Sequence, residues 1–159
     1  MKAINRIFFV IAGLIVLISC NKGDLYFKYN KVEKENWYRD SVLTFTIDTL
    51  KSEQYGKYSI SLELTTSMVY PYSEIYLEVN HNLNDIVFYS DTIRYKVAND
   101  FGKRLGSGNG SLRQISLPYK SDVWLNRPRT YEINIAHLMY ADPLKGVDKV
   151  GLRIYKDEN

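Results

Sequence analysis

The chain contains one cysteine, Cys20, and the residues before it suggest a specific use for its thiol. Leu17, Ile18 and Ser19 place an apolar residue at position −3 and a small residue at position −1. This tetrapeptide resembles the bacterial lipoprotein box, in which the thiol is alkylated with a diacylglycerol and the preceding signal is removed. Two or three acyl chains give almost permanent membrane attachment, at about 0.8 kcal/mol per buried methylene. We therefore predict that Cys20 is an acylated N-terminus without a catalytic role.

The segment before Cys20 has the layout of a secretory signal. Lys2 and Arg6 precede a continuous apolar run over residues 7–18. As a helix this run would span about 18 Å, short of the roughly 30 Å hydrocarbon core, which favours a signal peptide over residues 1–19. Residue 21 is Asn rather than the Asp that commonly retains lipoproteins in the inner membrane. We expect an outer-membrane anchor with the domain on the periplasmic face, and exposure on the cell surface is the alternative.

Four glycines between residues 102 and 110 form the most prominent motif of the mature chain. A phosphate-binding loop leads into a helix, whereas a strand-like segment follows here and no Gly-Lys-Ser/Thr occurs. The motif is therefore interpreted as a mobile hairpin loop in which glycine supplies positive φ. The alternative is that the adjacent Lys103 and Arg104 help to bind an anion or a partner.

Histidine and carboxylate residues give no clear catalytic pattern. His81 lies in a turn-like cluster and is expected in a solvated hairpin loop, whereas the parity of His137 predicts a buried, hydrogen-bonded ring. The two histidines are too far apart in sequence for a metal-ligand motif. Glu63, Glu78 and Glu132 are expected to be solvated on polar strand faces. No nucleophile-elbow motif occurs, so we expect neither an enzyme nor a cofactor or metal site.

Aromatic residues are the other candidate binding groups, because the chain has 14 Tyr and 2 Trp. Several are expected in loops or at strand ends, where exposed rings commonly bind sugars or peptides. The alternative is that these rings fill the ends of the fold. The candidate partner or glycan contacts are Trp37, Tyr70, Tyr72, Lys103, Arg104 and Trp124, with Tyr38 and Tyr119 as further aromatic candidates.

The elements that would position these residues are strands, because apolar and polar residues alternate with period two through most of the chain. Gly, Asn, Asp and Pro clusters separate the runs, which predicts a single antiparallel, jelly-roll-like β-sandwich of about eight strands. A single helical turn is expected at 136–144, where alternation lapses. Expected strands cover residues 43–48, 58–65, 75–79, 86–89, 93–97, 112–117, 131–135 and 150–155.

Length and charge bound the remaining possibilities. The 159 residues are enough for one domain, and 45% hydrophobic with 25% charged residues is a globular composition. Removal of residues 1–19 takes away Lys2 and Arg6 and reduces the formal charge from +3 to about +1. This balance argues against a nucleic-acid partner. The predicted organisation is a signal peptide at 1–19, acylated Cys20 and a tether to 35, and a sandwich at 36–159.

Several segments together resemble the gliding-motility lipoprotein family called GldH. Besides the box at Cys20, they are residues 37–40 (WYRD), 70–75 (YPYSEI), 106–110 (GSGNG) and 146–154 (GVDKVGLRI). The resemblance implies a cell-envelope lipoprotein needed for gliding, with no enzymatic activity attached to the family. Because the gliding apparatus is linked to a protein-secretion system, it also implies partners among other gliding or secretion lipoproteins and envelope proteins. The alternative function is a carbohydrate-binding envelope lipoprotein that uses exposed Trp and Tyr.

The resemblance also implies modification, because bacteria of this group glycosylate exported proteins at Asp-Ser/Thr followed by an aliphatic residue or Thr. Three tripeptides fit this pattern and make Ser41, Thr49 and Thr92 candidate O-glycosylation sites. Turn chemistry is the alternative explanation for these short patterns, because Asp and Ser favour turns.

Overall fold

The computed structural model describes residues 24–108 and 110–156, so Cys20 and the predicted signal peptide lie outside the described residues. Within the described part, the strands form two four-stranded antiparallel sheets and one two-stranded sheet. The strands are β1 (Asp24–Lys31), β2 (Asn36–Trp37), β3 (Leu43–Ile47), β4 (Gly56–Thr66), β5 (Glu74–His81), β6 (Tyr89–Lys96), β7 (Arg113–Leu125), β8 (Tyr131–His137), β9 (Leu144–Lys145) and β10 (Val147–Tyr155). Two short 3-10 helices, η1 (Glu33–Glu35) and η2 (Ser52–Gln54), lie in connections.

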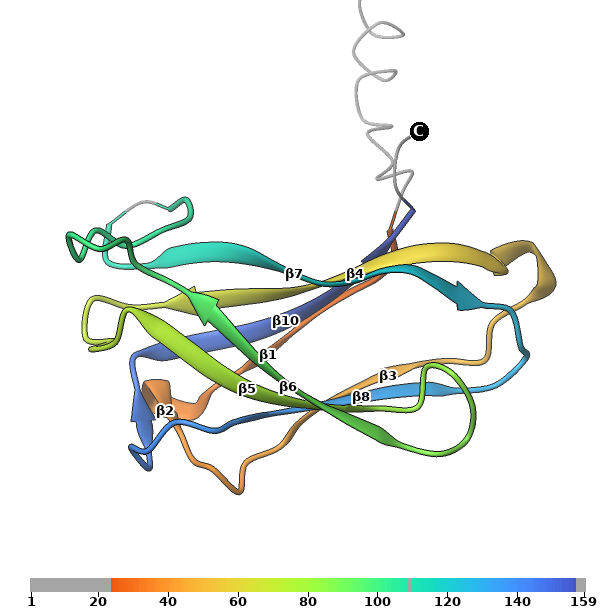
Figure 1. The fold of residues 1–159 in the computed structure, drawn as a ribbon, viewed down its shortest axis with the longest axis horizontal. Helices are drawn as coiled ribbons and strands as arrows, with labels where there is room; N and C mark the ends of the chain where they lie inside the picture. The colour runs from red at the N-terminus through yellow and green to blue at the C-terminus, as the bar shows by residue number, and fades with distance from the viewer. Residues whose placement is uncertain (1–23, 109, 157–159) are drawn as a thin grey trace, which may run out of the picture.

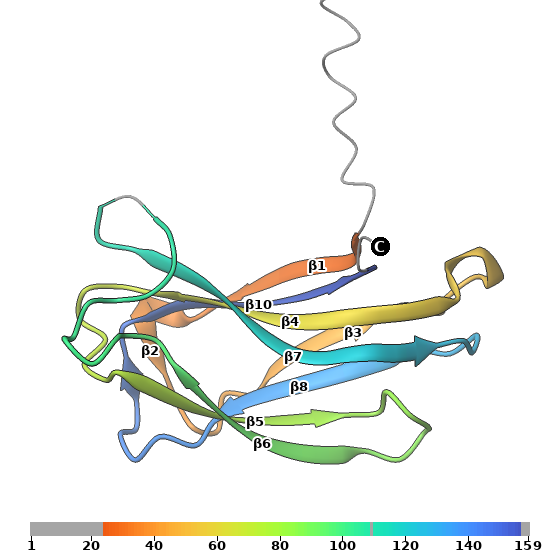
Figure 2. The ribbon, with the colours of Figure 1, turned by 45° about the horizontal axis from the view of Figure 1, so that its top comes forward.

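The two large sheets pack face to face as a β-sandwich (Figure 1). One has the strand order β1-β10-β4-β7 and the other β3-β8-β5-β6, and Figure 2 shows the first of these orders across its upper layer. These are the strand orders of an eight-stranded jelly roll. The small β2–β9 pair lies at one end. The all-β sandwich expected from the alternation is confirmed.

The core lies between the sheets and follows the period-two pattern. On β5, Ile75, Leu77 and Val79 are buried, and Glu74, Tyr76 and Glu78 alternate with them toward solvent. Alternate side chains of a strand point to opposite faces, so one face of each strand enters the core. The opposite sheet contributes the buried residues Ile60, Leu62, Leu64, Val150, Leu152 and Ile154.

The N-terminal boundary of the sandwich differs from the expectation of a tether through residue 35. Residues 24–31 form β1, which pairs with β10 from Asp24 opposite Tyr155 to Lys31 opposite Lys149. Arg153 Nε donates to Asp24 Oδ1 at 2.9 Å across this pair. The segment was missed because Leu25, Tyr26 and Phe27 are consecutive apolar residues, which breaks the alternation.

Two local expectations for strands and turns are also wrong. Residues 86 and 87 form bends, and one strand, β6, runs from Tyr89 to Lys96 instead of two. No helical turn forms at 136–144, because β8 continues to His137 and the chain then reaches β9 through the cis Asp142–Pro143 peptide bond. The side chain of Arg39 donates to the carbonyls of Met139 and Tyr140, both at 3.0 Å, and ties this connection to the segment after β2.

The outer face of β4 is buried, contrary to the expectation that Glu63 is solvated. The Ser61 and Ser116 hydroxyls donate to Glu63 Oε1 at 2.9 and 2.7 Å. Tyr29 covers the neighbouring position on β10, Gly151, where an added Cβ would lie 2.7 Å from the tyrosine ring. Burial of the outer face therefore depends on a ring from β1, two strands away, and cannot be inferred from β4 alone.

The register assigns each loop to one of two ends. Asp24 lies opposite Tyr155, which lies opposite Ser59 on β4, so the start of β1 is near the start of β4. The end of β4, Thr66, pairs with Arg113 at the start of β7. In Figure 2 the green-to-teal loop between β6 and β7 accordingly lies away from the start of β1. The glycine-rich loop thus occupies the end opposite to the entry of the chain.

Candidate functional site

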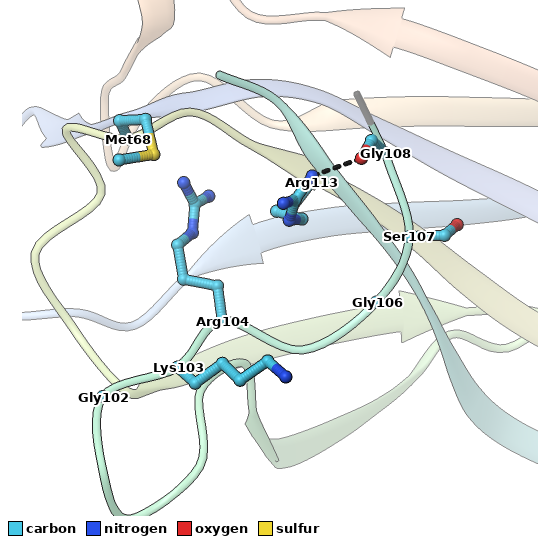
Figure 3. Close-up of a pocket in the computed structure, with 8 residues that line it drawn as sticks. All are labelled: Met68, Gly102, Lys103, Arg104, Gly106, Ser107, Gly108 and Arg113. Carbon is cyan, nitrogen blue, oxygen red and sulfur yellow. Dashed lines mark hydrogen bonds between the residues drawn. The ribbon is translucent and has the colours of Figure 1, made fainter. Parts of the chain in front are cut away.

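A basic pocket lies at this glycine-rich end. Its lining comes from the β4–β5 loop, the β6–β7 loop and the first residue of β7, and consists of Met68, Gly102, Lys103, Arg104, Gly106, Ser107, Gly108 and Arg113. In the close-up of Figure 3, the side chains of Arg104 and Arg113 extend toward the same space, with Met68 beside them. The pocket therefore combines three cationic side chains with one apolar residue. We call it the basic pocket.

Two isolated antiparallel bridges shape the β6–β7 loop, one between Ala98 and Arg104 and one between Ser107 and Gln114. Within the first, the Asn99 side chain accepts hydrogen bonds from the backbone N–H groups of Phe101 and Lys103. In the second, Ser107 and Gln114 exchange backbone hydrogen bonds at 2.9 and 2.8 Å. Gly102, Gly106, Gly108 and Gly110 all have positive φ, as expected for the glycines of such a loop.

Gly106 carries a further constraint, because it packs directly on β7. An added Cβ there would lie 2.1 Å from the carbonyl oxygen of Gln114, well inside van der Waals contact. Gly102 has a similar φ but open space around its Cα. Gly106 thus fixes the position of the loop against β7, whereas Gly102 serves only the turn.

Arg104 is the most constrained cation of the basic pocket. Its Nη2 donates to the Thr66 hydroxyl, whereas its Nη1 is buried without a hydrogen-bond partner. Burial lowers the pKa of Arg104, and the neighbouring positive charge of Arg113 lowers it further. A buried donor without a partner and a neighbouring like charge both reduce the free energy of unfolding. The position of Arg104 is therefore unfavourable for the stability of the isolated domain.

Arg113 was not identified from the sequence. Its Nη1 donates to the Gly108 carbonyl, which holds the guanidinium against the glycine-rich loop. As the first residue of β7, it follows the glycines by three positions, and this flanking basic residue was the available signal. Met68 was also missed, because only the fold brings the β4–β5 loop beside the β6–β7 loop.

The aromatic candidates do not form one surface. Trp37 is 1% exposed, its ring meets His137 edge-on, and its Nε1 donates to the Ser41 carbonyl. Tyr70 is buried, and burial raises the pKa of its hydroxyl, which donates to the Glu74 carbonyl.

The other rings are more accessible but widely placed. Tyr72 is exposed beside Tyr70, at the same end as the basic pocket, and Tyr38 is exposed in the segment after β2. Trp124 is exposed at the opposite end, where it pairs with Lys57 near the start of β4. Tyr72 and Trp124 therefore lie at opposite ends of the sandwich and do not form a shared platform for a glycan.

His81 is buried at a sandwich edge, so the expectation of a solvated loop is wrong. It is the last residue of β5, with 2% exposure, and its Nδ1 accepts the backbone N–H of Leu83 at 3.3 Å. The neutral ring therefore offers Nε2–H to Asp91 Oδ2, 3.3 Å away. Burial lowers the pKa of His81, and the nearby Lys120 lowers it further.

Asp91 is the centre of this edge cluster and links the two sheets. It points inward from β6 and accepts the hydroxyl of Tyr119 at 2.6 Å, and Lys120 Nζ lies 2.7 Å away on β7. Lys120 and Tyr119 together lower the pKa of Asp91 to about 2. Because β6 and β7 are the edge strands of opposite sheets, this cluster closes one side of the sandwich.

His137 fulfils the expectation of a buried, hydrogen-bonded ring. It is fully buried at the end of β8, and its Nε2 lies 3.0 Å from the carbonyl oxygen of Trp37. Burial lowers its pKa. The three candidate glycosylation residues, Ser41, Thr49 and Thr92, are all exposed. Within residues 24–108 and 110–156, no helix has the length and apolar character needed to cross a bilayer.

The fold and the basic pocket define an antiparallel jelly-roll domain with a cationic recess at one end. Known proteins resemble it over nearly its whole length. The profile of the GldH lipoprotein family matches residues 24–154. The protein called "Gliding motility lipoprotein GldH homolog" from Christiangramia forsetii is 26% identical over 166 residues and covers 100% of both chains. "Gliding motility lipoprotein GldH" from Flavobacterium johnsoniae is 28% identical over 152 residues, covering 91% of this chain and 92% of its own.

The chain belongs to the GldH lipoprotein family. Membership of a lipoprotein family places it among membrane-anchored proteins of the cell envelope. Solved structures give only distant likenesses. Dimeric latent PorU from Porphyromonas gingivalis has a TM-score of 0.30 at 14% identity, over 83% of this chain and 13% of its own. Infectious bursal disease virus Gx strain gives 0.29 at 14% identity, over 84% and 33%.

Proposed function

We propose that the mature protein is a non-enzymatic component of the gliding apparatus and its associated secretion system, anchored through a lipid on Cys20. Family membership, the names of the two relatives and the lipoprotein box support this proposal. The observation that carries the mechanism is that the two ends of the domain differ. The chain enters the sandwich at Asp24, whereas the basic pocket lies at the other end of the same sheet.

This arrangement lets the domain present its far end to other proteins at a fixed distance from the membrane. Only residues 21–23 separate Cys20 from β1, and this length of chain spans at most about 14 Å. Along β4, the distance from Ser59, at the level of the chain entry, to Thr66, at the far end, is about 23 Å. The lipid thus holds one end close to the membrane, and the β4–β5 and β6–β7 loops meet neighbouring proteins. Asn21 favours the outer membrane, with the domain on its periplasmic face.

The anchor is tested with Cys20→Ala and the control Ser19→Ala, which keeps a small residue at position −1. In cells fed a labelled fatty acid, we expect Cys20→Ala to lose the label and to leave the membrane fraction, and Ser19→Ala to keep both. Labelling of the Cys20→Ala protein would contradict the anchor.

The role in the apparatus is tested by deleting the gene in a gliding host. We expect reduced surface spreading or reduced export of adhesins, restored by the wild-type gene and not by Cys20→Ala. Unchanged spreading and unchanged export in the deletion strain would contradict the proposed function. A soluble Cys20→Ala protein that fully restores both would show that the anchor is dispensable.

Glycosylation is a separate part of the proposal, and exposure of Ser41, Thr49 and Thr92 is compatible with it. The intact mass of the protein purified from native membranes should exceed the mass of the lipidated chain. Replacing the used residue by alanine should remove the excess, and replacing the exposed Ser90 on the same strand as Thr92 is the control. An intact mass without an excess would contradict this prediction.

A further inference from the structure

We propose that the basic pocket binds an acidic side chain of a protein partner, with Arg104 and Arg113 contacting the carboxylate and Met68 contacting an adjacent apolar residue. This inference rests on the proposed function, because that function supplies a neighbouring protein at this end of the domain. It adds the chemistry of recognition, which neither the family nor the anchor provides.

The first argument is the charge of the basic pocket. Lys103, Arg104 and Arg113 line one recess, and none of them forms an ion pair within the described residues. Some other cations of the domain are ion-paired, such as Arg94 with Glu74. Glu35, a carboxylate that reaches this end, accepts the hydroxyl of Ser67 instead. Three unpaired cations around one recess favour an anionic ligand.

The second argument is the use of the donors. Arg104 Nη2 donates to the Thr66 hydroxyl, and Arg113 Nη1 donates to the Gly108 carbonyl in the glycine-rich loop. These contacts fix both guanidinium groups and leave further donors free. Arg104 Nη1 also lacks a partner, but it is buried, so a ligand entering the basic pocket meets the other donors of the two guanidinium groups. A carboxylate there would accept charge-assisted hydrogen bonds and offset the repulsion between the two arginines.

The third argument selects a protein rather than a free anion. Met68 lines the pocket and is 70% exposed. Val69 follows it in the chain, and Phe101 precedes the lining residue Gly102; both are exposed, Phe101 at 96%. Exposed apolar groups beside a cationic recess gain nothing from phosphate or acetate. They do gain from a polypeptide that presents an acidic residue together with an apolar neighbour.

The test uses the mature lipoprotein in detergent micelles with ¹⁵N-labelled arginine. The side-chain N–H signals are followed during titration with the peptide acetyl-Leu-Glu-Leu-amide, its Gln counterpart, and inorganic phosphate at constant ionic strength. We expect the Glu peptide to shift the Arg104 and Arg113 signals with saturation and to bind at least about tenfold tighter than the Gln peptide, as for a charge-assisted hydrogen bond. The Arg94 signal should stay in place, because Glu74 already occupies that guanidinium.

Variants separate the pocket from its surroundings. Arg104→Gln and Arg113→Gln should each weaken binding of the Glu peptide about tenfold or more, whereas Arg94→Gln should not. Met68→Glu supplies a competing carboxylate from an exposed position and should block binding, with Val87→Glu, at an exposed position in the β5–β6 loop of the opposite end, as the control. Because Met68 is exposed, this variant tests the pocket even if replacement of the half-buried Arg104 disturbs the loop.

The outcomes are decisive in each direction. Equal affinity for the Glu and Gln peptides, or tighter binding of phosphate than of the Glu peptide, would overturn the inference. Binding that survives Met68→Glu would also overturn it. The gene-deletion test of the proposed function is independent of these titrations. A deletion defect without carboxylate binding would refute the pocket chemistry alone, and carboxylate binding without a deletion defect would refute the proposed role in gliding or secretion.

Discussion

Replacing Asp91 by asparagine tests whether charge holds the open side of the sandwich closed. The side chain keeps its size and an oxygen that accepts the Tyr119 hydroxyl, but it loses the ion pair with Lys120, whose Nζ lies 2.7 Å away. The substitution therefore removes mainly the electrostatic part of the link between β6 and β7.

The magnitude follows from the depressed pKa of Asp91, about 2 against an ordinary value of 3.8. In a fully protected site this difference corresponds to about 2.4 kcal/mol of stability. Solvent reaches 36% of the Asp91 side chain, so screening reduces the expected contribution to about 1 kcal/mol. The folded-state pKa is the lower one, so this contribution is complete above pH 4 and is lost as the pH falls through 2.

The assay is urea unfolding of the wild-type and Asp91→Asn proteins at pH 6 and at pH 2, since guanidinium chloride would screen the ion pair. We expect the variant to be about 1 kcal/mol less stable at pH 6 and nearly equal to the wild type at pH 2. Asp100→Asn removes an exposed ion pair with Lys96 and should cost less than about 0.5 kcal/mol. An Asp91→Asn deficit that is the same at both pH values would refute the electrostatic explanation.

Two further predictions concern the glycine-rich loop and the buried histidines. Gly106→Ala should destabilise the protein by about 3 kcal/mol, because positive φ is combined with a clash against β7; Gly102→Ala, with open space, should cost only about 1 kcal/mol. Thermal unfolding of both variants measures this difference, and equal losses would contradict the packing role of Gly106. Burial lowers the pKa of His81 and His137 in the fold, so their contribution to stability is complete above about pH 6.5 and is lost as the pH falls. Urea unfolding at pH 7.5 and 5.5 should show this loss, at most about 1.4 kcal/mol per pH unit and histidine, and His137→Gln should reduce it; a protein equally stable at both pH values would contradict it.

The period-two pattern determined most strands without the tertiary structure. Ile75, Leu77 and Val79 alternate with polar residues and form the buried face of β5. The pattern is local, because neighbouring side chains of any strand point to opposite faces. It failed for β1, whose residues 24–31 do not alternate, and this strand turned the expected tether into part of a sheet.

Pairing and convergence depended on the tertiary structure. Asp24 and Arg153 are hydrogen-bonded although almost the whole domain separates them in sequence, and no local pattern encodes that pairing. His81 has the sequence context of a loop residue, but Asp91 and Tyr119 from other strands surround and bury it.

The basic pocket shows the same division. The sequence by itself indicated a cationic, glycine-rich loop with Lys103 and Arg104, because charge and positive-φ residues are local properties. The tertiary structure alone placed Met68 and Arg113 beside Arg104 and left Arg104 Nη1 buried without a partner. The physical reason is that burial and desolvation depend on all the segments that meet at a site, and the β4–β5 loop reaches this one only because β4 and β7 are neighbours in the folded sheet.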